Sequence, residues 1–129
     1  MVRILVVDDD KNTRRLLKAV LEAENYTVLT AAGANEALEI MDREYVDLIV
    51  LDVMMPNMNG YEFTETLRDG KSTLPILMIS AKQLPEDKKK GFLAGTDDYM
   101  TKPIDEEEML LRIRALLRRA KIADERRIV

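Results

Sequence analysis

The chain has 129 residues, of which 47% are apolar and 34% are charged, and its formal net charge is −4. A chain of this size suggests one domain with a substantial hydrophobic core. The negative charge argues against a nucleic-acid-binding surface spread over this segment. Because the sequence contains no cysteine and no histidine, disulfides, thiolate chemistry, the usual kind of zinc site and a Ser-His-Asp triad are excluded.

The distribution of apolar residues predicts no membrane span, because no apolar run approaches the roughly 20 residues that a spanning helix needs. The first residues, Met1 to Ile4, lead directly into a predicted strand and leave no room for a signal peptide. The absence of cysteine is compatible with an intracellular protein. We therefore expect a cytoplasmic protein that has no contact with a membrane.

In chain order, short apolar runs alternate with segments of helical periodicity. Strands are predicted at residues 3–7, 26–30, 45–51, 74–79 and 97–101. Helices are predicted at about residues 11–24, 33–41, 60–69, 85–95 and 106–117. Asn59 with Glu62, and Asp105 with Glu108, have the spacing of a capping box. We expect residues 88–91 to interrupt the fourth of these helices.

The βαβαβαβαβα order predicts an α/β fold. Connections between parallel strands are right-handed crossovers, so the five strands are expected to form a doubly wound parallel sheet with helices on both faces. In such a sheet every strand points its carboxyl end at the same edge. Ligands of open α/β sheets bind at that edge, so candidate functional residues are expected there.

The third strand carries the most informative residue. Four apolar residues, 48–51, run into the carboxylate of Asp52, and Pro56 and Gly60 follow in a predicted turn. Such a run is typical of a strand that is buried on both faces. A lone carboxylate at its end is costly to ionise unless it has partners, and we expect those partners at the same edge of the sheet.

The other strand ends supply these partners. The polar residues predicted at this edge are Asp8, Asp9, Asp10, Asp52, Ser80 and Lys102. Converging carboxylates stay ionised when a cation is present, and a site with few oxygen ligands favours Mg²⁺. A metal, an ammonium and a hydroxyl together suit a phosphoryl group, and Asp52 is placed to accept that group as a nucleophile.

Most of these residues also have a purely structural explanation. The acids at 8–10 suit the N-terminus of a helix, Lys102 suits a solvated turn, and Ser80 suits the end of a strand. Asp52 has no comparable explanation, because an unpaired carboxylate after an apolar run is expensive. Convergence at one edge makes four independent explanations improbable together.

Four groups of motifs carry a resemblance to a known family over residues 1 to about 119. They are Leu5-Val6-Val7-Asp8-Asp9-Asp10, Leu51-Asp52-Val53-Met54-Met55-Pro56 with Asn59-Gly60, Ile79-Ser80-Ala81, and Asp97-Asp98-Tyr99 with Lys102-Pro103. On these residues the chain resembles a bacterial two-component response regulator receiver domain. The resemblance implies a flavodoxin-like sheet of strand order 2-1-3-4-5. It also implies a phosphoacceptor regulatory domain that is not an enzyme beyond its own phosphorylation and dephosphorylation.

The resemblance implies roles for the acids at the sheet edge. Asp52 would be the phosphoacceptor, and the partner would be a sensor histidine kinase. Mg²⁺ would be bound directly by Asp9, Asp52 and the backbone carbonyl of Met54. Asp8 would contribute to the magnesium site through a water molecule, and Lys102 would bind a phosphoryl oxygen.

The resemblance also implies a conformational switch. The new charge on the phosphoacceptor would draw Ser80 inward, and Tyr99 would fill the space that Ser80 leaves. Tyr99 fits a plain strand aromatic packed against the core as well. The peptide bond between Lys102 and Pro103 is expected to be cis.

Residues 113–119 resemble the last helix and linker of receivers that are joined to winged-helix DNA-binding domains. Residues 1–119 are then the receiver domain, and 120–129 begin a linker to a missing effector domain that controls transcription and contacts DNA. The resemblance also implies a phosphorylation-dependent homodimer through the last two helices and the fifth strand. Its predicted surface comprises Lys89, Lys90, Asp97, Asp98, Glu108, Arg112 and Arg119. A solvated charged face is the alternative, since single exposed ion pairs contribute little.

Three other functions remain open. A phosphohydrolase with an aspartate nucleophile usually carries a second acid where Met54 stands. A flavin-binding module would place the flavin phosphate against the acids at 8–10, which would repel it. A stand-alone or phosphorylation-independent receiver that acts as a protein-interaction module leaves the combination of acids, hydroxyl and lysine without a purpose.

Overall fold

The computed structural model describes the backbone of residues 1–128 and the side chains of residues 1–121. Its strands are β1 (Arg3–Val7), β2 (Thr27–Ala31), β3 (Leu48–Asp52), β4 (Ile76–Ser80) and β5 (Asp98–Thr101). Its helices are α1 (Lys11–Glu22), α2 (Ala34–Arg43), α3 (Gly60–Asp69), α4 (Pro85–Ala94) and α5 (Glu106–Ile128). Strands and helices alternate along the whole chain, as the sequence predicts.

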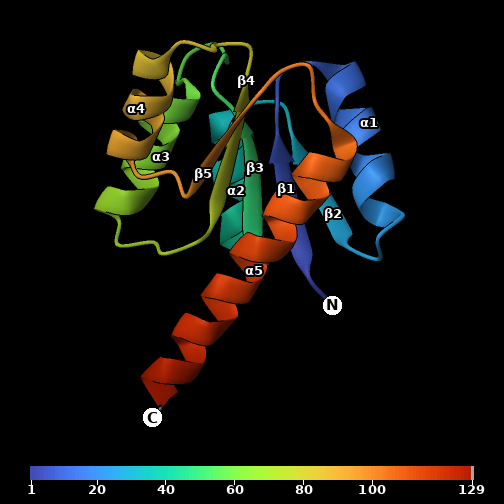
Figure 1. Cartoon of the computed structure of the whole chain (residues 1–129), viewed down its shortest axis with the longest axis vertical. Helices are drawn as coiled ribbons and strands as arrows, with labels where there is room; N and C mark the ends of the chain where they lie inside the picture. Colours follow the sequence, from blue (N-terminus) through green and yellow to red (C-terminus); the bar gives the residue numbers. More distant parts are fainter. Residues whose placement is uncertain (129) are drawn as a thin grey trace.

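The strands form one parallel sheet in the order β2-β1-β3-β4-β5, which confirms the predicted doubly wound, flavodoxin-like topology (Figure 1). Strand β3 lies at the centre, and in its register Val50 is opposite Val6 of β1 and Leu77 of β4. All five residues of β3 and of β4 are buried. The central strands therefore deliver their last residues, Asp52 and Ser80, to the middle of one sheet edge.

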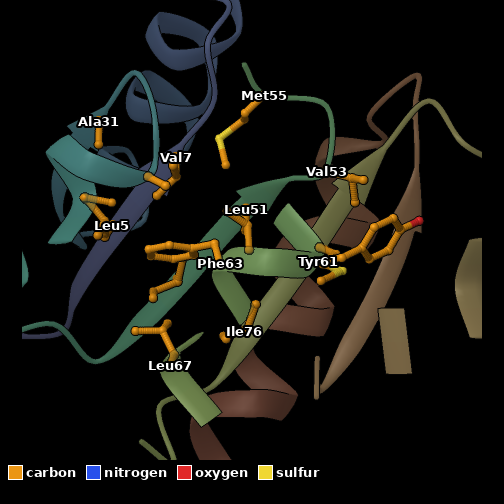
Figure 2. Close-up of a cluster of buried hydrophobic side chains, with 14 of the residues drawn as sticks. Leu5, Val7, Ala31, Leu51, Val53, Met55, Tyr61, Phe63, Leu67 and Ile76 are labelled. Carbon is orange, nitrogen blue, oxygen red and sulfur yellow. The ribbon is translucent and has the colours of Figure 1, made fainter. Parts of the chain in front are cut away.

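The two faces of the sheet build two apolar clusters because successive strand residues point to opposite sides. In β1, Ile4 and Val6 join the cluster that α1 and α5 cover. Leu5 and Val7 join the cluster that α2, α3 and α4 cover, where Phe63 is fully buried (Figure 2). The sequence predicts this arrangement of helices on both faces, and it holds the functional edge between the two layers.

Helix α4 is continuous through residues 88–91, so the predicted interruption there is wrong. Gly91, the last residue of that run, is buried against the sheet. A β-carbon on Gly91 would lie 3.0 Å from the Tyr99 ring and 3.1 Å from the Met78 sulfur. Glycine at this position therefore permits a close approach of α4 to β4 and β5 and does not end the helix.

Most other element boundaries differ from the prediction by one to three residues. Helix α1 ends at Glu22 and not at residue 24, because Asn25 adopts a left-handed φ of 68°. The capping box of Asn59 and Glu62 is confirmed, with both reciprocal hydrogen bonds present. Asp105 accepts the N–H of Glu108 as a cap, whereas the Glu108 carboxylate accepts from Arg112.

Helix α5 continues to Ile128 and so includes residues 120–128, which the sequence led us to assign to the start of a linker. The domain boundary near residue 119 remains a prediction. Val129 lies outside the described residues, as do the side chains from residue 122 onward. Among the described helices, none is both long enough and apolar enough to cross a bilayer.

Candidate functional site

Asp52 ends β3 with its side chain almost completely buried, at 5% exposure. The following turn folds back so closely that the N–H of Gly60 donates to the Val53 carbonyl at 2.9 Å. A β-carbon on Gly60 would lie 2.6 Å from the Asp52 carbonyl oxygen. Glycine is thus required where α3 begins, because the first turn of this helix packs directly on the backbone of the candidate phosphoacceptor.

Two further carboxylates converge beside Asp52. Oxygen atoms of Asp8, Asp9 and Asp52 all lie within 4.8 Å of one another, with Asp8 and Asp52 buried and Asp9 exposed. Asp10 serves another purpose, because it accepts the N–H of Asn12 at 2.9 Å as the N-cap of α1. This backbone hydrogen bond lowers the pKa of Asp10. The structure therefore divides the acidic run into one cap and two candidate ligands.

Lys102 lies between the two buried carboxylates. Its Nζ atom is 3.3 Å from Asp8 Oδ2 and 3.7 Å from Asp52 Oδ1. Its backbone N–H donates to the Ser80 carbonyl at 2.8 Å, and its peptide bond to Pro103 is cis, as predicted. The turn after β5 thus aims one ammonium group at the point where the ends of β1 and β3 meet.

The charge balance of this edge favours a cation. Burial raises the pKa of Asp52 to about 6, with the negative charge of Asp8 as a further cause, while the ammonium of Lys102 acts in the opposite direction. One ammonium therefore compensates two buried carboxylates incompletely. A divalent ion among these oxygen atoms would supply the missing positive charge and hold Asp52 ionised.

Asp8 is fixed on several sides. Its Oδ1 atom accepts the N–H of Asp10 at 2.8 Å, its Oδ2 atom faces Lys102, and its backbone carbonyl accepts from Arg14 Nη1 at 2.6 Å. Sequence reasoning missed Arg14. A signal was available, since a long side chain in the first turn of a helix leans back toward the helix N-terminus, and here toward the end of β1.

The predicted switch residues are linked through the backbone of one residue, Lys82. Ser80 is fully buried and its Oγ atom accepts the N–H of Lys82 at 3.1 Å. The hydroxyl of Tyr99 donates to the carbonyl of the same Lys82 at 3.0 Å. Tyr99 is 4% exposed, so its ring lies inside the domain beneath α4. The backbone of Lys82 therefore connects the edge residue Ser80 with an aromatic residue of β5.

The predicted dimer residues fall into two groups. One group is Lys89, Lys90 and Arg119, which are exposed; Asp97 and Glu108 are exposed as well but belong to the paired group. Others are already paired within the chain: both carboxylate oxygens of Asp98 accept from Arg112 at 2.9 Å, and Arg112 also pairs with Glu108 at 2.9 Å. These three residues form a network across β5 and α5. A partner protein would therefore contact three charges that are already paired with one another.

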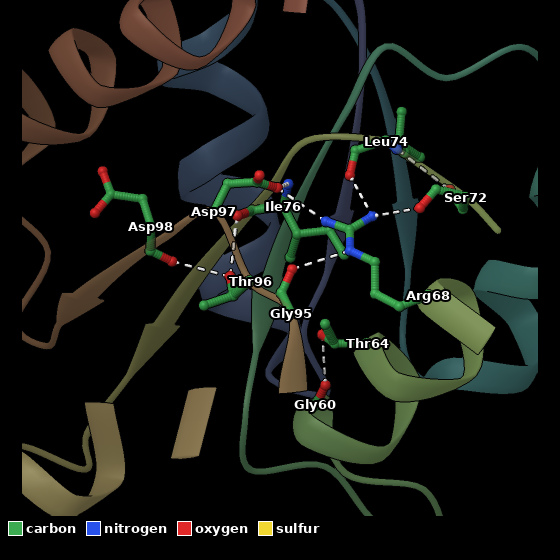
Figure 3. Close-up of polar contacts among 10 residues, drawn as sticks. All are labelled: Gly60, Thr64, Arg68, Ser72, Leu74, Ile76, Gly95, Thr96, Asp97 and Asp98. Carbon is green, nitrogen blue, oxygen red and sulfur yellow. Dashed lines mark hydrogen bonds and ion pairs between the residues drawn. The ribbon is translucent and has the colours of Figure 1, made fainter. Parts of the chain in front are cut away.

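Asp97 is tied to the domain at the opposite edge of the sheet. Its Oδ2 atom accepts the N–H of Ile76 at 2.8 Å and Arg68 Nη2 at 2.9 Å (Figure 3). The other acceptors of Arg68 are the backbone carbonyls of Ser72, Leu74 and Gly95. Sequence reasoning missed Arg68, which joins the end of α3, the loop before β4 and the end of α4.

The donor set fits Mg²⁺. Carboxylate oxygens of Asp8, Asp9 and Asp52 are hard ligands, and the exposed Asp9 leaves room for the water molecules that Mg²⁺ retains. In the described part of the chain every buried side-chain nitrogen or oxygen has a hydrogen-bond partner. The cluster is therefore an organised polar site within an otherwise satisfied interior.

The fold and this acidic edge are those of the receiver class. The chain belongs to the family described as response regulator receiver domain, whose model matches residues 4–114. It is therefore a signalling domain of two-component response regulators and not a catalytic enzyme. Receiver domains of this family bind Mg²⁺ at an acidic pocket and interact with histidine kinases.

Individual relatives agree with this assignment. The chain is 47% identical over 121 residues to the alkaline phosphatase synthesis transcriptional regulatory protein PhoP of Bacillus subtilis, covering 94% of this chain and 50% of PhoP. It thus spans about half the length of this curated relative. The Francisella response regulator 1452 receiver domain superposes with a TM-score of 0.89 at 32% identity, covering 93% of this chain and 99% of that one.

A second solved structure, of a receiver domain activated by BeF3, has the same fold. The BeF3-activated DrrB receiver domain superposes with a TM-score of 0.83 at 34% identity, covering 92% of this chain and 98% of that one. The fold is shared over nearly the full length of each structure.

Proposed function

We propose that Asp52 accepts a phosphoryl group from a sensor histidine kinase in a Mg²⁺-dependent reaction. The observation that carries this proposal is the buried carboxylate of Asp52 at the end of β3, within 4.8 Å of two further acids and 3.7 Å from the Lys102 ammonium. The activation of the DrrB receiver by BeF3, a phosphoryl analogue, supports the same chemistry here.

The proposed step is an attack of an Asp52 carboxylate oxygen on phosphorus. An acyl phosphate bond forms, the phosphorus–nitrogen bond of a phosphohistidine breaks, and the imidazole leaves with its electron pair. Lys102 then neutralises charge on a phosphoryl oxygen, because transfer depends on positioning and charge compensation. Asp9, Asp52 and the Met54 carbonyl would hold Mg²⁺ directly and Asp8 would hold it through water, and the ion would supply further charge neutralisation.

Intact mass spectrometry tests the proposal. Wild-type protein incubated with acetyl phosphate and Mg²⁺ should gain the mass of one phosphoryl group, and EDTA should prevent the gain. Asp52→Asn should gain nothing. Asp42→Asn, which removes an exposed carboxylate from α2, should behave as wild type. Equal mass gain in wild type and Asp52→Asn would overturn the proposal, and a wild-type protein that gains no mass would leave a phosphorylation-independent interaction module.

We propose further that phosphorylation favours an arrangement in which Ser80 turns toward the phosphoryl group and Tyr99 stays inside the domain. The backbone of Lys82 supports this coupling, since its N–H donates to the Ser80 hydroxyl and its carbonyl accepts from the Tyr99 hydroxyl. Tyr99→Ala should accept the phosphoryl group and fail to change its assembly state. An unchanged response of Tyr99→Ala to full phosphorylation would leave Tyr99 as a core aromatic.

We propose that the response is homodimerisation through α4, β5 and α5. Charged residues of both signs lie there, and Leu93 is 81% and Leu111 55% exposed beside them. Sedimentation with Mg²⁺ and beryllofluoride should show a dimer that Leu93→Asp abolishes. Leu16→Asp, which changes a half-exposed leucine of α1, should leave the dimer intact. A wild-type monomer with and without beryllofluoride would contradict the dimer.

The output is proposed to be transcription. The relative PhoP is a transcriptional regulatory protein about twice as long as the matched region, and we propose that residues 120–129 connect this domain to a winged-helix DNA-binding domain in the cytoplasm. DNA contact would belong to that second domain. A native chain that continues past Val129 into a basic helical domain would support this output, and a native chain that ends there would remove it.

A further inference from the structure

Tyr61 in the first turn of α3 makes an unusual set of contacts with α4. Its side chain is 3% exposed, and its hydroxyl donates to the backbone carbonyl of Asp87 at 3.2 Å. The ammonium of Lys90, one turn further along α4, lies 4.8 Å from the centre of the Tyr61 ring. Figure 2 shows the ring at the border of the apolar cluster, with the hydroxyl directed away from it.

These contacts matter because α4 has few other attachments. Its buried residues are Gly91 and Ala94, which offer little side-chain surface to the core. A helix that buries so little apolar area depends on polar contacts for its position. At its far end these are the hydrogen bond and ion pair of Arg68 with Gly95 and Asp97. At the N-terminal end of α4, Tyr61 supplies a polar contact through its hydrogen bond to the Asp87 carbonyl.

Tyr61 also lies beside the switch residue Tyr99. Burial raises the pKa of the Tyr61 phenol well above its usual range, and the neighbouring Tyr99 side chain acts in the same direction. The hydroxyl of Tyr99 donates to Lys82, just before α4, while the hydroxyl of Tyr61 donates to Asp87 within it. Two neighbouring phenols therefore hold the loop before α4 and its first turns.

We infer that Tyr61 is a positioning residue that couples the Ser80–Tyr99 switch to α4 and hence to the face that carries Lys90. The inference rests on the proposed phosphoryl switch. When Tyr99 is inside, Tyr61 holds α4 in the arrangement seen in this structure. Because coupling between two sites is reciprocal, a change at Tyr61 must then alter the affinity of the distant Asp52 site for a phosphoryl analogue.

The test compares the beryllofluoride affinity of wild type and Tyr61→Phe, measured in the presence of Mg²⁺ by NMR titration. Phenylalanine retains the ring and its contact with Lys90 and removes only the hydroxyl. Loss of one neutral hydrogen bond should weaken beryllofluoride binding by about 2- to 10-fold. Tyr26→Phe, a half-buried tyrosine next to β2 on the opposite face of the sheet, is the matched control and should bind as wild type.

Two further measurements separate coupling between Tyr61 and the Asp52 site from a general effect of Tyr61 on the stability of the domain. The double variant Tyr61→Phe/Tyr99→Phe should lose less affinity than the product of the two single losses, because the hydroxyls act on one element. A Tyr61→Phe protein that unfolds at lower denaturant concentration and binds beryllofluoride as wild type does would overturn the inference. If wild type itself does not bind beryllofluoride, the proposed phosphoryl switch fails, and this coupling fails with it.

Discussion

Replacement of Arg68 by methionine should destabilise the domain although Arg68 is far from the acidic edge. Arg68 donates four hydrogen bonds, three to backbone carbonyls and one to Asp97, at distances of 2.8–3.1 Å (Figure 3). Methionine retains most of the aliphatic stem, which packs under Gly95. The substitution therefore removes the donors while it preserves most of the packing.

The magnitude follows from these bonds. Each contributes about 0.5–1.5 kcal/mol net, and an acceptor left without a partner costs more where water is excluded. The Arg68 side chain is 22% exposed, so water replaces part of what is lost. We expect the free energy of unfolding to fall by about 2–4 kcal/mol, a large share of the roughly 5–15 kcal/mol typical of a domain.

Urea unfolding followed by circular dichroism measures this loss. With a denaturant slope of about 1–3 kcal/mol per molar urea, the midpoint should fall by about 1–2 M. Arg43→Met is the matched control, because Arg43 makes one exposed hydrogen bond of 3.4 Å to the Glu39 carbonyl, and its free energy of unfolding should stay within about 0.5 kcal/mol of that of wild type. Equal small shifts in both variants would refute the assignment of Arg68 as a structural junction.

Three more outcomes follow from the acidic edge. In metal-free buffer Asp52→Asn should raise the free energy of unfolding at pH 7 by about 1–2 kcal/mol. The folded-state pKa of Asp52 is raised from 3.8 to about 6, so the free energy of unfolding of wild type falls as pH rises through that window. Urea midpoints should show that the extra stability of Asp52→Asn vanishes near pH 4. A stability gain that does not depend on pH would contradict the raised pKa. Gly60→Ala should cost about 1–3 kcal/mol in thermal unfolding, whereas Gly33→Ala, which has no atom within 4 Å of the new β-carbon, should change little; equal losses would refute the close-packing argument. Mg²⁺ at about ten times its dissociation constant should stabilise wild type by roughly 1.4 kcal/mol in the same assay, and Asp9→Asn should lose most of this gain while Asp42→Asn retains it.

The sheet and the acids at its edge were predictable because both follow from local patterns. Apolar runs such as β3 and β4 define buried strands, and parallel strands bring their ends together. Asp8, Asp52 and Lys102 therefore meet where the sequence predicts, although they are up to 94 positions apart. The different roles of Asp9 and Asp10 were implied only by the family resemblance and not by the local pattern, because adjacent acids are distinguished only by which one caps α1.

The contacts of long side chains were beyond the sequence. Arg68 and Tyr61 have ordinary helical positions, and their partners are mostly backbone carbonyls, which leave no trace in residue identity. The predicted interruption at residues 88–91 was wrong although a glycine inside a helix, here Gly91, usually weakens the helix. The reason for this glycine is the Tyr99 ring beneath it, which becomes visible only when α4 is placed on the sheet.

The thin attachment of α4 also has an evolutionary consequence. Since Gly91 and Ala94 are the buried residues of this helix, its remaining positions tolerate substitution at small cost to folding, as exposed sites generally do. Descendants of one ancestral gene can thus acquire new side chains along α4 and choose different binding partners without rebuilding the hydrophobic interior. Paralogues sharing one cell would then diverge first on this helix, while Gly91 and the tyrosines beneath it remain unchanged.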